Sequence, residues 1–195
     1  MIIVITSEQP LDNEAAQINA LFTAGLEILH LRKPTFTIEG YKVLLDLIDV
    51  NYHNRIMTHQ FPELTTVYGL RGVHLQEQAR LDLEDDLEVT VRRYINKGFS
   101  VTSSFHSKED IIACTTDFEY VLLSPVFGSI SKKGYQGKGF DVSDINKKVI
   151  GMGGVNENTI QATLDLGYKG VGVLGGVWNT SNPVQSFIKI NKKLK

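Results

Sequence analysis

Short runs of apolar residues alternate along the chain with longer stretches in which apolar residues recur at helical spacing. A short apolar run is typical of a strand buried on both faces, and recurrence every three or four positions is typical of an amphipathic helix. Eight strands are expected on this basis: Ile2–Ile5, Glu27–Leu31, Arg55–Met57, Gly72–Leu75, Phe99–Thr102, Tyr120–Leu123, Lys148–Ile150 and Gly170–Leu174.

Helices are expected between most of these strands. Gly25, Gly98 and Gly167 directly follow helical patterns, where glycine commonly terminates a helix. The periodic stretches cover residues 11–22, 38–48, 61–68, 87–95, 108–114, 157–166 and 184–194. Asn156 is expected to act as the N-cap of the helix over 157–166.

The alternation of strands and helices predicts a parallel sheet with right-handed crossovers. Eight such units are the pattern of a (β/α)8 TIM barrel, here formed by residues 1–195 as one domain. At about 24 residues per unit the chain is lean for this fold, which typically needs about 250 residues. The alternative is an open doubly wound sheet, which would require the third and fourth strands to be wrong.

Composition narrows the class of protein. The 195 residues are 42% hydrophobic and carry a net charge of −2, which fits a soluble domain and disfavours a nucleic-acid or membrane-surface binder. The single cysteine excludes an internal disulfide and a cysteine-rich zinc site. The first residues show no basic segment followed by a signal-peptide core, and no run is long enough to span a membrane, so a cytoplasmic location is expected.

Candidate chemistry gathers where the strands end, because barrel active sites form at the C-terminal ends of strands. Four of the five histidines, His30, His59, His74 and His106, lie at or beside such ends. His59 and His106 follow their strands and are the better candidates for a pocket. His30 and His74 lie within strands, where an inert hydrogen-bonded interior role is the alternative.

Glycines are concentrated in the second half of the chain, where thirteen of the seventeen lie after position 97. Four of them fall in the 17-residue segment Ser124–Phe140, which also carries three lysines. This composition suits a mobile lid over a phosphorylated ligand, with a basic surface loop as the alternative.

Two glycine pairs, Gly153-Gly154 and Gly175-Gly176, follow the last two strands. Loops at these two positions bind phosphate in many barrels, because backbone N–H groups without side chains can approach the oxygen atoms. A phosphate site at this corner is expected.

Taken together, these motifs resemble the thiamine phosphate synthase/TenI family in order and over nearly the whole length. The matching segments are His30–Lys33, Gly72–Leu75, Ser104–His106, Tyr120–Lys132, Gly151–Val155 and Gly170–Val177. The resemblance implies binding of a small phosphorylated thiazole. The synthase branch joins it to an aminopyrimidine carried as a Mg²⁺-bound pyrophosphate ester, and the TenI branch isomerises a thiazole carboxylate phosphate.

Site residues follow from the resemblance position by position. Arg32 would face a pyrophosphate, and His30 and Ser104 would contribute to substrate binding. The residues that would bind the thiazole phosphate are Ser129, Ser131, Lys132, Gly153, Gly154, Gly175 and Gly176. Lys132 would also take part in the reaction. The resemblance also suggests a homodimer.

Departures from the family pattern separate the branches. The synthase carries carboxylates after the third and fourth strands that hold Mg²⁺, but here His59 stands after the third, and Glu77 is the only acidic candidate after the fourth. No metal is therefore expected unless the protein is a synthase, and a TenI-like thiazole tautomerase is the favoured interpretation. That branch has a histidine where this chain has Pro125, so His106, and secondarily His59, is expected to supply the acid/base.

Two alternatives remain open at this point. One is a thiamine phosphate synthase with rearranged metal ligands. The other is a protein without catalytic activity that binds thiazole phosphate or thiamine phosphate.

Overall fold

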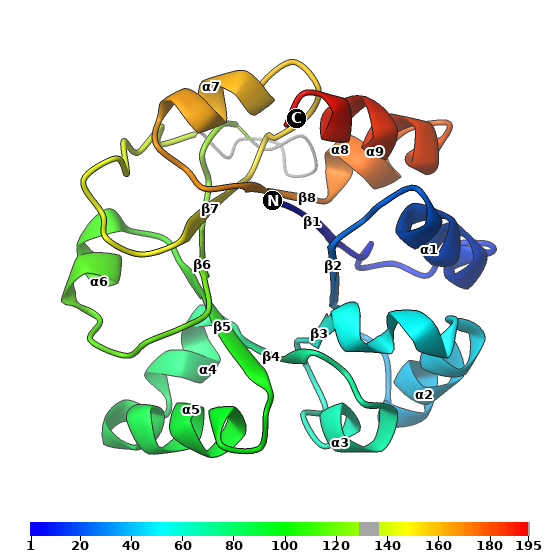
Figure 1. Ribbon diagram of the computed structural model, residues 1–195, viewed down its shortest axis with the longest axis horizontal. Helices are drawn as coiled ribbons and strands as arrows, with labels where there is room; N and C mark the ends of the chain where they lie inside the picture. Colours follow the sequence, from blue (N-terminus) through cyan, green and yellow to red (C-terminus); the bar gives the residue numbers. More distant parts are fainter. Residues whose placement is uncertain (129–136, 195) are drawn as a thin grey trace.

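Eight parallel strands close into a barrel in chain order, with helices around the outside (Figure 1). A computed structural model describes residues 1–128 and 137–194, so Ser129, Ser131 and Lys132 lie outside the described residues. The strands are β1 (Ile2–Ile5), β2 (Ile28–Leu31), β3 (Ile56–Thr58), β4 (Gly72–Leu75), β5 (Ser100–Phe105), β6 (Val121–Leu123), β7 (Val149–Met152) and β8 (Val171–Val173).

Closure of the sheet is decided by β1, which pairs with both β2 and β8: Ile3 lies opposite Ile28 on one side and Gly172 on the other. The (β/α)8 prediction is therefore confirmed, and the open doubly wound alternative is wrong. All eight predicted strands are present, including the short third and fourth ones.

The helices of the described residues are all short. For this reason eight strand–helix units fit into a chain that is shorter than usual for this fold. They are α1 (Glu14–Thr23), α2 (Ile38–Leu47), α3 (Leu64–Tyr68), α4 (Glu77–Leu81), α5 (Leu87–Ile95), α6 (Lys108–Ala113), α7 (Ile160–Asp165), α8 (Gly175–Trp178) and α9 (Pro183–Lys192), with 3-10 turns at Val50–Arg55 and Glu84–Asp86.

The start of α7 differs from the expected position. The helix begins at Ile160, because a hydrogen-bonded turn occupies the preceding residues. In that turn the Asn158 N–H donates to Oδ1 of Asn156, and the Thr159 N–H donates to the Asn156 carbonyl. Asn156 therefore caps the turn, and the predicted N-cap of α7 itself is wrong.

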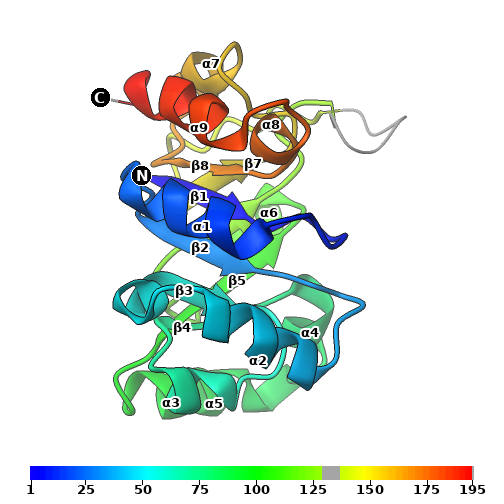
Figure 2. The ribbon, with the colours of Figure 1, turned by 90° about the vertical axis from the view of Figure 1, so that its right-hand side faces the viewer.

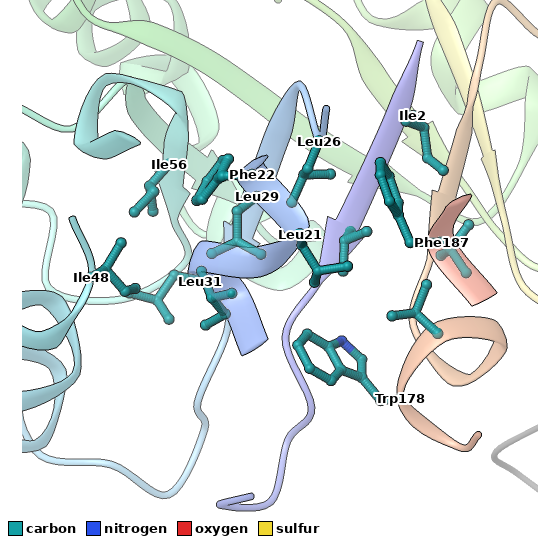
Figure 3. Close-up of a cluster of buried hydrophobic side chains, with 14 of the residues drawn as sticks. Ile2, Leu21, Phe22, Leu26, Leu29, Leu31, Ile48, Ile56, Trp178 and Phe187 are labelled. Atoms are coloured by element: carbon teal, nitrogen blue, oxygen red, sulfur yellow. The ribbon is translucent and has the colours of Figure 1, made fainter. Parts of the chain in front are cut away.

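Outward-facing strand residues and inward-facing helix residues form the larger core. Figure 3 shows one side of it, where Ile2, Leu29 and Ile56 meet Leu21 and Phe187 from the helices. Burial of each such side chain contributes about 1.5–3 kcal/mol to folding.

The alternate residues of the strands point into the barrel and divide it into an apolar part and a polar part. Apolar residues fill most of it: Ile3, Ile5, Ile28, Met57, Tyr120, Leu122 and Ile150. Toward the C-terminal strand ends the interior turns polar, with buried His30, His74 and Thr102. This polar layer is the floor of the candidate site.

The two ends of the barrel are distinct. The N-terminus and the end of α9 lie on one side of the barrel, on the left in Figure 2, and the loop that follows β1 lies on the other. Across residues 1–128 and 137–194, no helix combines the length and the apolar character needed to cross a membrane.

Candidate functional site

Three imidazoles meet at the C-terminal end of the barrel interior. His30 comes from β2, His59 directly follows β3, and His74 comes from β4. The Nδ1 atom of His30 lies 2.9 Å from Nε2 of His59, and the rings of His59 and His74 lie 4.2 Å apart between centroids. We call these residues the histidine cluster.

Hydroxyl groups form hydrogen bonds with two of the three rings. The Tyr120 hydroxyl lies 2.7 Å from Nε2 of His30. The hydroxyls of Thr102 and Ser104 lie 2.8 and 2.7 Å from the two nitrogens of His74. The orientation of His74 is therefore set by β5, which pairs with β4, and that of His30 by the residue that directly precedes β6.

The cluster is electrically neutral at neutral pH. Burial lowers the pKa of His30 to about 3. Burial is the main cause that lowers the pKa of His59 and of His74 well below the usual value, and His30 and Arg32 lower both further, as His74 does for His59. A base with so low a pKa does not exchange protons readily near pH 7, so the cluster is unsuited to the proton shuttle expected of His59.

His59 differs from its two neighbours because it is only half-buried, at the open end of the cluster. Its Nδ1 atom is nevertheless shielded from water and has no hydrogen-bond partner within the described residues. An unsatisfied buried nitrogen is unusual and calls for an explanation.

Arg32 follows β2 at the rim above the cluster. Both its backbone and its guanidinium have bonding partners. Its backbone N–H donates to the Thr6 hydroxyl, which in turn donates to the Arg32 carbonyl, so the ends of β1 and β2 are tied together. The guanidinium forms an ion pair with Glu8, which follows β1. Arg32 therefore provides a positive charge held at the rim.

The next residue, Lys33, is fully buried and contacts the segment that connects β1 to α1. Its Nζ atom lies 2.5 Å from Oε1 of Glu14 on α1 and donates to the carbonyl of Gln9 at 3.0 Å. Burial lowers the pKa of Lys33 and raises that of Glu14. Lys33 thus anchors the loop between β1 and α1, and is not available to a substrate.

His106 lies apart from the histidine cluster. Its Nδ1 atom is 2.7 Å from Oε2 of Glu77, and its backbone N–H donates to Oε1 of the same carboxylate. Lys138 donates to the His106 carbonyl, and these residues line a groove that also includes Arg80 and α6 residues such as Asp110. The predicted acid/base and the predicted metal ligand are therefore joined to each other outside the barrel interior.

The glycine corner is assembled from three loops in close contact. A side chain at Gly153 would meet Pro125, and one at Gly154 would meet the carbonyl of Gly128 at 2.5 Å. A side chain at Gly176 would meet the carbonyl of Val155 at 2.6 Å. These contacts explain why glycine is required at three of the four predicted positions.

Backbone donors at this corner have no acceptor among the described residues. The hydrogen bonds found among residues 1–128 and 137–194, outside regular strands and helices, employ none of the N–H groups of Gly153, Gly154, Gly175 and Gly176 as donors. The first two glycines have φ values of +97° and +67°, which L side chains rarely adopt. Open N–H groups of this kind are suited to phosphate oxygens.

A family model described as thiamine monophosphate synthase matches residues 2–177. The chain belongs to the TMP-TENI family. This confirms the resemblance that the motifs indicated, and it associates the protein with thiamine biosynthesis.

Solved structures and curated proteins extend the comparison. A thiamine phosphate pyrophosphorylase from Bacteroides thetaiotaomicron is 30% identical, with 98% of this chain and 95% of that chain aligned at a TM-score of 0.76. A Pyrococcus furiosus thiamine phosphate pyrophosphorylase has a TM-score of 0.75 at 17% identity over 98% and 93% of the two chains, which shows the shared fold.

Curated relatives with the name thiamine-phosphate synthase are more distant in sequence. The protein from Dictyoglomus turgidum is 22% identical over 89% of this chain and 79% of its own length. The protein from Prochlorococcus marinus strain AS9601 is 24% identical over 98% of this chain, which spans only 55% of that relative.

The Mg²⁺ site of the TMP-TENI synthases is not reproduced by the residues at these strand ends. Mg²⁺ prefers carboxylate and other oxygen ligands, but His59 follows β3. Glu77, after β4, has both carboxylate oxygens bonded to His106, and Glu8, after β1, pairs with Arg32. The described residues therefore do not fit a carboxylate-held Mg²⁺ ion.

Sequence reasoning missed the partners that hold the site together. Tyr120, Thr102 and Glu8 contact predicted site residues, yet none stands in a motif that signals this role. The alternation of inward and outward residues along a strand could have placed Thr102 and Tyr120 in the interior. The ion pair of Glu8 with Arg32 joins residues 24 positions apart, and no spacing rule signals it.

Proposed function

We propose that this TMP-TENI protein catalyses the synthase reaction, in which a phosphorylated thiazole is joined to an aminopyrimidine and inorganic pyrophosphate leaves. The observation that carries the proposal is the position of Arg32. Its guanidinium, which pairs with Glu8 in this structure, stands at the rim within electrostatic reach of His59 and His74, and it would exchange that partner for a departing pyrophosphate, which needs charge neutralisation. The names of the relatives support the same reaction.

The two substrates would occupy different parts of the rim. The open N–H groups of the glycine corner are suited to the thiazole phosphate, next to the loops that follow β6, β7 and β8. Arg32, on the β2 side, would bind the pyrophosphate. The thiazole ring nitrogen would then form a bond to the carbon that carries the pyrophosphate, and pyrophosphate would leave with the electron pair of the broken C–O bond, over the histidine cluster.

A thiazole tautomerase is the second candidate, favoured by the poor fit to Mg²⁺. It needs a group that takes up and releases a proton near pH 7. His106 is bonded to Glu77 away from the barrel interior, and His59 has a strongly lowered pKa. For these reasons the tautomerase, although favoured by the sequence alone, ranks behind the synthase.

A turnover assay with both substrate sets tests the proposal. The purified protein is incubated with thiazole phosphate plus aminopyrimidine pyrophosphate, and separately with the thiazole carboxylate phosphate, each with added divalent metal and with EDTA. We expect thiamine phosphate and pyrophosphate from the first mixture only. Turnover of the second mixture alone would establish the tautomerase, and binding without turnover of either would establish a binding protein.

A further inference from the structure

The histidine cluster has the composition of a transition-metal site. One ring nitrogen from each of His30, His59 and His74 can be chosen so that all three lie within 4.8 Å of one another. Among the described residues, this is the group of histidine, cysteine and acidic side chains whose ligand atoms are close enough to share a metal ion. Ligand nitrogens around a tetrahedral Zn²⁺ ion are about 3.3 Å apart, given Zn–N distances of about 2.0–2.1 Å. Small ring rotations would bring the three nitrogens to that spacing, with the 2.9 Å separation between Nδ1 of His30 and Nε2 of His59 widening slightly.

Hydroxyl groups that could hold a metal-binding ring in place already contact two of the rings. Histidines that bind metals usually donate their other N–H to an oxygen atom, which fixes the ring and its tautomer. The Tyr120 hydroxyl can accept from Nε2 of His30, which leaves Nδ1 facing His59. Thr102 and Ser104 offer the same support to His74, one of them giving up its contact when the other nitrogen binds the ion.

The cluster is least enclosed on the side of His59, which is only partly buried, whereas His30 and His74 are fully buried.

We propose that His30, His59 and His74 bind one divalent transition-metal ion, with Zn²⁺ as the reference ion. Nitrogen ligands select such ions over Mg²⁺, so the site would replace the carboxylate-held Mg²⁺ that the described residues do not fit. Three protein ligands leave a further coordination position for water or a substrate oxygen. The site does not depend on the proposed reaction, because ion binding is measured without substrate.

Metal titration tests the site directly. The protein, with any affinity tag removed and after dialysis against EDTA and then buffer, is titrated with Co²⁺, whose visible absorption is intense in tetrahedral sites. We expect saturation at one equivalent per chain, loss of the absorption when Zn²⁺ is added, and a higher melting temperature with Zn²⁺. Absence of saturable Co²⁺ and Zn²⁺ binding would overturn the proposal.

Variants assign the ion to the cluster. His59→Ala removes the ligand that is least buried and already has one unsatisfied nitrogen, with His59→Gln as a second variant if folding, checked by circular dichroism, is impaired. His106→Ala, at an exposed histidine outside the cluster, is the matched control. Loss of a hydrogen-bond partner of a metal ligand costs about 10–100-fold in metal affinity, so loss of a ligand should cost at least ~100-fold. Equal affinity in the His59 variants and the wild type would contradict the assignment.

Discussion

Residues at the rim have two different roles: Arg32 carries a charge, and the glycines allow loops to pack closely. The backbone of Arg32 is fixed by the Thr6 hydroxyl, and its guanidinium pairs with Glu8. The glycines of the corner have no side chains, which allows three loops to approach one another. Both kinds of residue can be tested by single substitutions.

Replacing Arg32 tests the charge. Arg32→Ala should lower kcat/KM for the synthase reaction by about 100-fold, because removal of one group that stabilises developing negative charge typically costs 10²–10³-fold. Steady-state kinetics measures the effect, with Arg93→Ala, on the exposed face of α5, as the control that should retain activity. A wild-type kcat/KM for Arg32→Ala would remove Arg32 from the site.

Replacing Gly154 tests the shape. Gly154→Ala places a Cβ atom 2.5 Å from the Gly128 carbonyl, so we expect a raised KM for the thiazole phosphate together with a loss of about 1–3 kcal/mol in the free energy of unfolding. Gly69→Ala is the matched control, since Gly69 has a similar φ of +61° but nothing within 4 Å of the added atom. Equal KM values for both variants would contradict a phosphate site at the corner.

At the scale of secondary structure, the ion pair of Lys33 with Glu14 joins the end of β2 to α1. Removing one partner of a buried pair leaves an uncompensated charge, so Glu14→Ala should lower the free energy of unfolding by about 3 kcal/mol. Urea denaturation measures this. Glu39→Ala, which breaks an exposed pair with Lys42 on α2, should change stability by less than about 1 kcal/mol. Equal losses in the two variants would show that Glu14 carries no special role.

The strands were predictable from the sequence and some helices were not, for a physical reason. Residues buried on both faces of a strand give short apolar runs such as Ile2–Ile5, which leave a clear signal. Helices α4 and α8 are too short for a helical period to appear, and the turn before α7 depends on side-chain bonds of Asn156. The close packing of loops at the glycine corner was foreseeable from its glycine pairs, whereas the separation of His106 from the histidine cluster depends on its bonds to Glu77.

For the molecule as a whole, buried hydroxyls link stability to alkaline pH. Burial raises the pKa of Tyr41 to about 12 and raises the pKa values of Tyr120 and Tyr168 as well. The unfolded chain ionises these groups near pH 10 while the folded chain keeps them protonated, so stability falls as the pH rises above 10. The loss should be about 1 kcal/mol per pH unit for each tyrosine.

Absorbance of tyrosinate near 295 nm checks this expectation. Of the seven tyrosines, these three should ionise only when the protein unfolds, so part of the absorbance change should coincide with the loss of helical circular dichroism. Tyr41→Phe should reduce the pH dependence above pH 10. Complete ionisation of all tyrosines in the folded protein would contradict the burial that underlies the barrel interior.

A crystal structure of the protein with thiazole phosphate would locate the site directly. We expect phosphate oxygens to accept hydrogen bonds from the backbone N–H groups of Gly153, Gly154, Gly175 and Gly176, with the thiazole ring directed toward the histidine cluster. A ligand bound instead in the groove lined by Glu77 and His106, or anywhere away from the C-terminal end of the barrel, would contradict this expectation.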